Sequence, residues 1–218
     1  MQLYIGNKNY SSWSLRAWLM LEKNEIKFDE VKLLLDTPAF YEALKEVTPS
    51  LKVPSIIDRD IHVWDSLAIC EYINDVYLSG RAWPELICQK AKARAIACEM
   101  HSGFTALRNE MPMNIRAKRS LIISDSCKED IVRVEQIWAE QMMQYADKGG
   151  WLFGRWSIAD AMFAPVVMRF QTYGTVLNSQ AQLYMDKVLS CPSLVKWVNE
   201  ALQETDIVEV DEAGEARE

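Results

Sequence analysis

The feature that most constrains the fold of this chain is a change of pattern at Gly80. Before that residue, short apolar runs typical of strands alternate with segments of helical spacing, and after it almost every segment has helical spacing. The chain has 218 residues, of which 50% are hydrophobic, so it can bury one or two cores. We therefore predict an α/β domain over residues 1–80, a short connector, and an all-α domain over residues 86–204.

The first domain carries the sequence signals of four strands and three helices. Thr37 and Pro38 form a favourable helix start, because a hydroxyl can cap the helix and proline is accepted in its first turn. In chain order, the expected elements are a strand at 3–5, a helix from about 11, a strand at 28–35, a helix from 37, strands at 53–57 and 61–64, and a helix from 66.

The second domain is expected to contain helices only. The expected helices are 85–111, 120–147, 158–173, 179–189 and 193–204. Breaks at Pro112, at Gly149-Gly150 and at Pro192 fit the rule that proline stops a helix and glycine favours its end. Ser157 and Asp160 have the Ser-x-x-Asp spacing of a capping box, and we interpret them as folding determinants.

The charge of the chain is concentrated at its C-terminal end. The net charge is -7, and residues 204–218 alone contain seven acids and one arginine. A nearly neutral body with an acidic tail is a poor partner for polyanions, so we expect no nucleic-acid partner. The composition of residues 205–218 predicts a solvated, disordered end. No apolar run reaches about 18 residues and the N-terminus is polar, which predicts a cytoplasmic protein with no membrane partner.

The cysteines and histidines do not have the spacing of a metal site. The five cysteines are odd in number and include no Cys-x-x-Cys, and the two histidines lie far apart in the sequence. We therefore expect no metal, no disulfide framework and no redox-active cysteine, with the thiols serving as small apolar residues. The cysteines are Cys70, Cys88, Cys98, Cys127 and Cys191.

A first candidate for chemistry is the segment Asn9–Arg16, between the first strand and the first helix. Backbone N–H groups at a helix start are unpaired and favour an anion. A thioredoxin-type redox protein places two cysteines three residues apart there, whereas this chain has Ser11 and Ser14. A serine hydroxyl can donate a hydrogen bond to the thiolate of a ligand and lower the thiol pKa. The alternative is a plain helix cap.

Two further segments have the chemistry of a peptide-like binding site. Val53-Pro54, if the bond is cis, would present the Val53 backbone to a ligand, and Lys52 beside it could meet a carboxylate. Asp65-Ser66 precedes an apolar helix, so Asp65 could meet an ammonium group and Ser66 a carboxylate. The alternatives are a trans proline at a strand edge and an ordinary helix cap.

Together these three segments resemble the N-terminal domain of the cytosolic glutathione transferases. The shared features are Ser-x-x-Ser-x-Arg after the first strand, Val-Pro near position 53 and Asp-Ser about a dozen residues later. The Ser-Ser-x-Ser-x-Arg run is similar to that of zeta-like bacterial members, although Trp13 replaces the cysteine usual in the zeta class. The resemblance implies a thioredoxin-like first domain, glutathione as co-substrate with no metal, and a homodimer.

The resemblance also implies roles for individual residues. Ser11 matches the serine that activates the glutathione thiol, and Ser12 is its alternative. Val53-Pro54 matches the Val–cis-Pro pair that holds the cysteinyl main chain, and Asp65-Ser66 matches the pair that holds the γ-glutamyl end. The second helix lacks the usual glutamine or histidine for the glycyl carboxylate, so Lys52 is the candidate for that group.

The second substrate is expected to bind between the two domains. Its expected pocket residues are Phe104, Arg108, Met111, Arg169 and Tyr173. The two arginines are the least suited to a helical core, because a buried arginine needs a partner. For each apolar residue the alternative is ordinary core packing.

Three functions remain open on the sequence. The first is a glutathione transferase that adds glutathione to a small electrophile. The second is a glutathione-dependent cis–trans isomerase of the maleylacetoacetate type. The third is a transferase-fold binding module without turnover, which the presence of Ser11, Pro54 and Asp65-Ser66 disfavours, because a scaffold does not need a ligand site.

Overall fold

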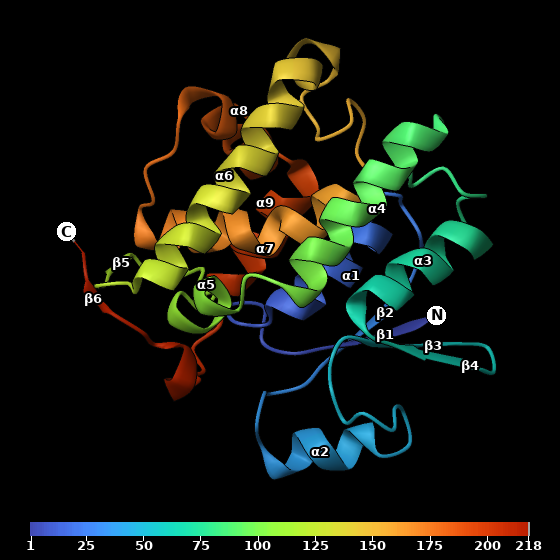
Figure 1. The fold of residues 1–218 in the computed structure, drawn as a ribbon. Helices are drawn as coiled ribbons and strands as arrows, with labels where there is room; N and C mark the ends of the chain where they lie inside the picture. The colour runs from blue at the N-terminus through green and yellow to red at the C-terminus, as the bar shows by residue number, and fades with distance from the viewer. Residues whose placement is uncertain (218) are drawn as a thin grey trace.

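The first part of the chain forms a four-stranded mixed sheet with helices on both faces (Figure 1). A computed structural model describes residues 1–217. The elements are β1 (Gln2–Ile5), α1 (Ser12–Glu22), β2 (Asp29–Lys32), α2 (Pro38–Leu44), β3 (Ser55–Asp58), β4 (Ile61–Trp64) and α3 (Ser66–Val76). The strand order is β2-β1-β3-β4, with β1 parallel to β2 and antiparallel to β3, and β3 antiparallel to β4.

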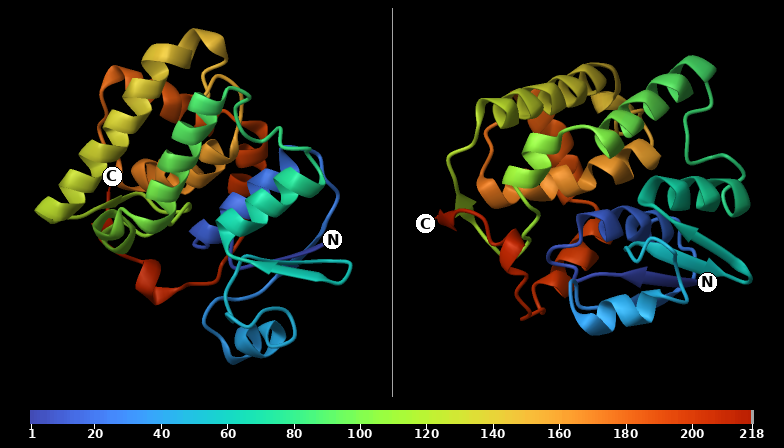
Figure 2. Two further views of the ribbon diagram at one scale, coloured as in Figure 1. Left: turned by 45° about the vertical axis from the view of Figure 1, so that its right-hand side comes forward. Right: turned by 60° about the horizontal axis from the view of Figure 1, so that its bottom comes forward.

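The alternation of side chains along the strands explains why both faces of this sheet are covered. Leu3, Ile5 and Ile56 are fully buried in the main core, on the side of α1 and α3. Tyr4 and Ile57 pack on the opposite face in a smaller cluster with residues of α2. Figure 2 shows α2 on the far side of the sheet from α1 and α3. This arrangement confirms the predicted thioredoxin-like first domain.

The second part is helical, as predicted. Its helices are α4 (Ile87–Ser102), α5 (Thr105–Glu110), α6 (Asp125–Tyr145), α7 (Ile158–Tyr173), α8 (Ser179–Leu189) and α9 (Pro192–Ala201). The minor elements are η1 (Ala146–Lys148), η2 (Glu209–Asp211) and a two-stranded ribbon of β5 (Arg119–Ser120) and β6 (Glu215–Ala216). No helix within residues 1–217 is both long enough and apolar enough to cross a membrane.

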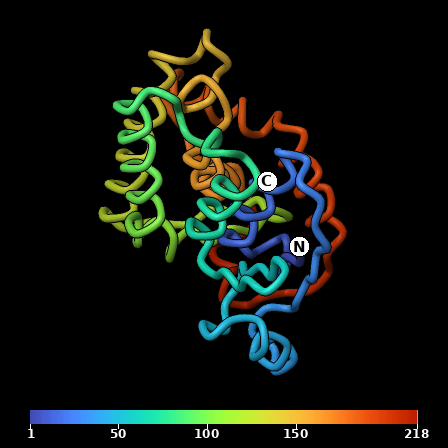
Figure 3. The backbone as a smooth tube through the Cα atoms, turned by 90° about the vertical axis from the view of Figure 1, so that its right-hand side faces the viewer, coloured from blue at the N-terminus to red at the C-terminus, as the bar shows by residue number. Residues whose placement is uncertain are grey.

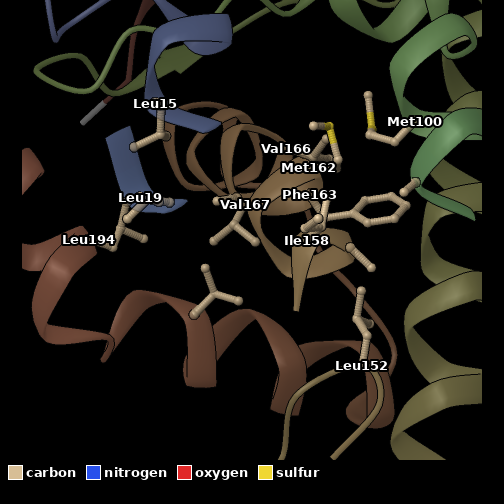
Figure 4. Close-up of a cluster of buried hydrophobic side chains, with 14 of the residues drawn as sticks. Leu15, Leu19, Met100, Leu152, Ile158, Met162, Phe163, Val166, Val167 and Leu194 are labelled. Carbon is tan, nitrogen blue, oxygen red and sulfur yellow. The ribbon is translucent and has the colours of Figure 1, made fainter. Parts of the chain in front are cut away.

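Helix α7 lies at the centre of the main core and joins the two parts. Nearly all of its residues are buried. In Figure 4 its side chains, among them Val166 and Val167, lie with Leu15 and Leu19 of α1 and Leu194 of α9. The candidate serines lie at the start of α1. One continuous core therefore packs this helix against the helical part of the protein.

The predicted helix 85–111 is wrong in one respect, because it is divided into α4 and α5. Gly103 ends α4, and Phe104 has a left-handed backbone with φ of 53°. The first turn of α5 is capped by a residue that is distant in the sequence, since the Leu107 N–H donates to Asp130 Oδ2 of α6 at 3.0 Å. A partner from α6 therefore allows a second helix to start where local spacing predicts one continuous helix.

The prediction of a disordered end at 205–218 is wrong for the described residues 205–217. In Figure 3 the C-terminal part of the chain, in red, runs beside the N-terminal part, in blue. β6 pairs with β5, and Glu212 accepts hydrogen bonds from Tyr10 (2.5 Å) and Asn114 (2.9 Å). Glu212 thus ties the segment to distant side chains, which its composition does not reveal.

Candidate functional site

Two adjoining clefts meet at the start of α1, at the edge of the thioredoxin-like part. The smaller has a volume of about 430 Å³ and the larger about 740 Å³. Both are lined by Trp13, Ser50, Lys52 and Val53, so they form one continuous depression. The smaller cleft adds Pro54, Trp64, Asp65 and Ser66, and the larger adds Ser11, Ser12, Arg108 and Arg169 among others.

Ser11 is the N-cap residue of α1 and its hydroxyl is hydrogen-bonded to that of Ser14. The two oxygens lie 2.7 Å apart, and Ser14 Oγ also accepts from the Gly6 N–H at 3.2 Å. A hydroxyl has one proton to donate. If Ser14 donates that proton to Ser11, the Ser11 proton is free to point into the larger cleft. The spacing of three residues therefore builds a short donor chain at the helix start.

Ser12 is the first residue of α1 and has a different partner. Its Oγ accepts from Arg169 Nη2 of α7 at 3.2 Å. Ser11 and Ser12 are 6% and 8% exposed, so both hydroxyls are largely shielded from water. The two serines thus differ in their partners: Ser11 has a local contact within its own helix, and Ser12 has a tertiary contact to a buried arginine.

The Val53–Pro54 peptide bond is cis, which confirms the expected isomer. The loop before it is held by side chains, because Ser55 Oγ donates to the Lys52 carbonyl at 2.9 Å and the hydroxyls of Thr48 and Ser50 lie 2.9 Å apart. Lys52 is exposed at the boundary of the two clefts.

Asp65 and Ser66 line the smaller cleft at the start of α3. Asp65 Oδ1 accepts from the Leu67 and Ala68 N–H groups at 2.9 and 3.2 Å, so one carboxylate oxygen caps the helix. The other oxygen, Oδ2, lies 3.1 Å from His101 Nε2 of α4. Burial, the largest effect, lowers the pKa of His101, while nearby Asp65 opposes this. The helical part and the thioredoxin-like part are therefore in contact at the Asp65 carboxylate.

The expected pocket for the second substrate is assembled only in part. Arg108 of α5 and Arg169 of α7 both line the larger cleft, beside Ser11 and Ser12. Phe104 is 6% exposed and belongs to the main core. Met111 and Tyr173 line a separate hollow of about 180 Å³. The left-handed turn at Phe104 changes the chain direction before α5, so residues of the expected single helix do not share one face.

Several residues of the larger cleft have no counterpart in the sequence prediction. Tyr10 and Trp13 lie within the segment Asn9–Arg16, so their place in the sequence already indicated that they could line the cleft. Asn109 and Tyr41 come from α5 and α2. Asp211 comes from the C-terminal segment, and no local pattern indicates that this acid reaches the cleft.

Among the residues that the structure describes, no cysteine lines either cleft. Burial raises the pKa of the Cys70 thiol to about 12 and that of Cys127 to about 11, which makes both poor nucleophiles at neutral pH. Cys191 is buried, and Cys88 and Cys98 are exposed on α4. Within residues 1–217, no group of three or more His, Cys, Asp or Glu side chains is arranged to hold a metal ion.

The chain resembles known proteins in sequence and in fold. Residues 10–76 match the family model "Glutathione S-transferase, N-terminal domain". A stringent starvation protein A homologue of Histophilus somni is 20% identical over 198 residues (84% of this chain, 90% of the relative). A probable maleylacetoacetate isomerase of Caenorhabditis elegans is 26% identical over 166 residues (76% of each).

The solved structures extend the likeness to the whole chain. A Burkholderia glutathione transferase homologue with bound glutathione superimposes with a TM-score of 0.70 at 21% identity, over 92% of this chain and 97% of that one. This likeness concerns the fold, including the order of the thioredoxin-like and helical parts. Residues 10–76 are therefore similar to the glutathione S-transferase N-terminal domain, and the chain as a whole has the fold of a glutathione transferase homologue.

Proposed function

We propose that this protein binds glutathione across the two clefts and joins it, through its sulfur, to a small electrophile. The observation that carries the proposal is the continuity of the clefts, which puts Ser11 and the Asp65-Ser66 pair at opposite ends of one depression lined by Val53. In this arrangement the γ-glutamyl end lies at Asp65-Ser66, the cysteinyl main chain lies along Val53, and Lys52 holds the glycyl carboxylate. The thiol then lies at Ser11.

Ser11 stabilises the thiolate in this proposal. The Gly6 N–H donates to the Ser14 oxygen, and the Ser14 hydroxyl donates in turn to Ser11, which leaves the Ser11 proton to donate to the sulfur. The start of an α-helix adds a positive field that favours the negative sulfur. The thiol proton passes to solvent, the sulfur forms a bond to the electrophilic carbon, and the leaving group departs with its electron pair.

The comparisons support glutathione as the ligand. The Burkholderia structure contains bound glutathione, and residues 10–76 of this chain match the corresponding N-terminal domain model. We propose that the site is of the serine type and zeta-like, on the Ser-Ser-x-Ser-x-Arg run at residues 11–16.

A second candidate is glutathione-dependent cis–trans isomerisation. The observations that favour it are the 26% identity to a probable maleylacetoacetate isomerase and the two arginines in the larger cleft, which could meet an acidic substrate. In this reaction glutathione adds to a double bond, the resulting single bond rotates, and glutathione leaves unchanged.

Calorimetric titration with glutathione, followed by assays with 1-chloro-2,4-dinitrobenzene and with maleylacetone, tests these functions. We expect glutathione binding and turnover of the aryl chloride above the uncatalysed rate. Turnover of maleylacetone alone would favour the isomerase, and binding without either turnover would favour a non-catalytic module. Absence of glutathione binding would contradict both enzymatic functions.

A further inference from the structure

Asp65, at the start of α3, has a backbone conformation that few residues other than glycine adopt. Its φ is 75°, a value at which a residue with a Cβ atom is strained. Such strain persists only where surrounding contacts fix the residue, and it is found most often at functional sites. Asp65 Oδ1 accepts from two N–H groups of α3, so this oxygen is committed to the helix cap. Oδ2 is the oxygen that remains for other partners.

The partner of Oδ2 is His101, in the last turn of α4. Nε2 of its ring lies 3.1 Å from Oδ2. The Asp65 side chain is 42% exposed, and the His101 side chain is 25% exposed. In the described chain, Asp65 lines the smaller cleft and His101 does not. The ring can therefore affect a ligand in this cleft only through the Asp65 carboxylate.

The two nitrogens of the His101 ring have different surroundings. A carboxylate can only accept, so Asp65 Oδ2 favours the neutral ring that carries its proton on Nε2. Nδ1 is buried and has no hydrogen-bond partner within residues 1–217. Trp13 packs edge-to-face against the ring, with 5.3 Å between the ring centres. A second proton would bind to Nδ1 and create a buried N–H group without an acceptor, which is costly.

The charges around His101 also favour the neutral ring. Burial is the largest effect that lowers the pKa of His101, and the positive charges of Arg16 of α1 and Arg108 of α5 add to it, while Asp65 opposes them. The neutral ring can orient Asp65 without cancelling its negative charge. A protonated ring would place a positive charge beside the carboxylate that, in the proposed function, meets the ammonium group of the γ-glutamyl end.

We propose that His101 is a positioning residue of the glutathione site: its neutral ring fixes the Asp65 carboxylate for the γ-glutamyl ammonium group, and a proton on the ring competes with that group for Asp65. This rests on the proposed function, which places the γ-glutamyl end at Asp65-Ser66. Because binding and protonation are linked, each weakens the other by the same factor. Glutathione affinity therefore falls as the pH decreases through the pKa of His101, and bound ligand lowers that pKa.

The test follows His101 directly by proton NMR, because the chain has only two histidines and each gives one C2–H signal. His62, the other histidine, is exposed on β4, and its Nδ1 lies 2.8 Å from the Val47 carbonyl oxygen. The spectrum of His62→Gln assigns the remaining signal to His101. Both signals are followed from about pH 4.5 to about pH 8, with and without saturating S-methylglutathione, which has no thiol to titrate.

We expect S-methylglutathione to lower the pKa of His101 by about one unit, and the His62 signal to titrate alike with and without the ligand. Linkage then requires that protonation of His101 weakens binding of S-methylglutathione by about tenfold. Calorimetric titration between about pH 5 and about pH 7 measures this loss independently, since the carboxylates and the ammonium group of the ligand titrate outside that range.

Two substitutions separate the donor of His101 from its charge. His101→Gln keeps a neutral donor that cannot be protonated, so it should bind S-methylglutathione within about twofold of the wild type near pH 7 and weaken less at lower pH. His101→Leu removes the donor and should bind severalfold more weakly near pH 7. Carboxyl groups titrate in all three proteins, so the difference between the wild type and His101→Gln isolates the histidine.

A pKa of His101 that does not respond to bound S-methylglutathione would overturn the proposal and leave glutathione binding standing. The same conclusion would follow if His101→Gln kept the full pH dependence of the wild type, or if His101→Leu bound as tightly as the wild type near pH 7. Absence of S-methylglutathione binding would refute the proposed function and the role of His101 with it. The expected pKa change without turnover of any electrophile would support the role of His101 and refute glutathione transfer.

Discussion

At the scale of single residues, the decisive feature is the donor chain Gly6–Ser14–Ser11 at the start of α1. We predict that Ser11→Ala lowers turnover at neutral pH and leaves glutathione affinity nearly intact. A hydrogen bond to a charged acceptor contributes about 1.5–3 kcal/mol, which corresponds to about one to two units of thiol pKa. The ultraviolet absorbance of the bound thiolate, followed against pH, measures this change, and the defect should shrink as the pH rises.

Ser12→Ala is the matched control for this prediction, because the neighbouring hydroxyl is equally shielded and accepts from Arg169 instead. It should affect the thiol pKa less than Ser11→Ala. If Ser12→Ala abolishes turnover and Ser11→Ala does not, the activating hydroxyl is that of Ser12. An unchanged pH profile in both variants would refute the serine mechanism.

At the scale of elements, the start of α7 depends on one buried carboxylate. Asp160 is fully buried and accepts from the N–H groups of Leu152 (3.0 Å) and Ser157 (2.8 Å), and from the Ser157 hydroxyl. The predicted capping box is therefore present. Because α7 lies at the centre of the core, its first turn affects the stability of both parts.

We predict that Asp160→Ala lowers the free energy of unfolding by about 2–4 kcal/mol, because it leaves two buried N–H groups without an acceptor. The exposed cap of α8 provides the comparison, since Asn178 Oδ1 accepts from the Gln180 and Ala181 N–H groups at 3.1 and 2.9 Å. Asn178→Ala should cost only about 1 kcal/mol. Urea denaturation of both variants measures the difference, and equal losses would show that burial adds nothing to the cap.

At the scale of the whole molecule, the C-terminal segment links pH to stability through Asp211. Burial, the largest effect, raises the pKa of Asp211 to about 6 from an ordinary 3.8, with Asp36 and Glu212 adding to it and Arg169 opposing it. A raised carboxyl pKa means that the folded state binds the proton more tightly than the unfolded state. The contribution of this group to stability therefore falls as the pH rises from about 4 to about 6, and is constant above that.

Asp211→Asn removes this dependence. We predict that the variant and the wild type have similar free energies of unfolding near pH 4, and that the variant becomes the more stable of the two as the pH rises to 6. Urea denaturation at a series of pH values measures the difference. A difference that stays constant over this range would contradict the assignment.

The assembly of the molecule is a second prediction at this scale. β4 is an edge strand of the sheet, and Ile61 and Trp64 on it are 48% and 43% exposed. Exposed apolar residues at a sheet edge favour association, and a twofold pair would bury the same patch from each chain. We predict a homodimer through this face.

Light scattering should therefore report twice the 25.1 kDa of one chain at micromolar concentration. Trp64→Glu should shift the protein toward the monomer, because it places a charge in the contact. Leu202→Glu, which changes an exposed apolar residue just after α9, should leave the dimer intact. A monomeric wild-type protein would refute the prediction.

The sequence by itself determined those structural features that depend on residues close together along the chain. Helix α7 and helix α8 have the predicted bounds, and the capping box of Ser157 and Asp160 forms. The order of strands and helices also predicted the fold class, because periodicity decides which face of each element is apolar. These features require few partners from distant segments.

Only the tertiary structure decided the features that depend on contacts between distant segments. The cap of Asp130 on α5 divides a predicted single helix, and Glu212 and Asp211 bring the acidic C-terminal segment back to Tyr10 and the larger cleft. Ser11 and Ser12 are adjacent in sequence, yet a contact from Arg169 on α7 gives them different partners. Composition and spacing describe a residue's neighbours along the chain, whereas the charge and hydrogen bonds around these side chains come from elements that only folding brings together.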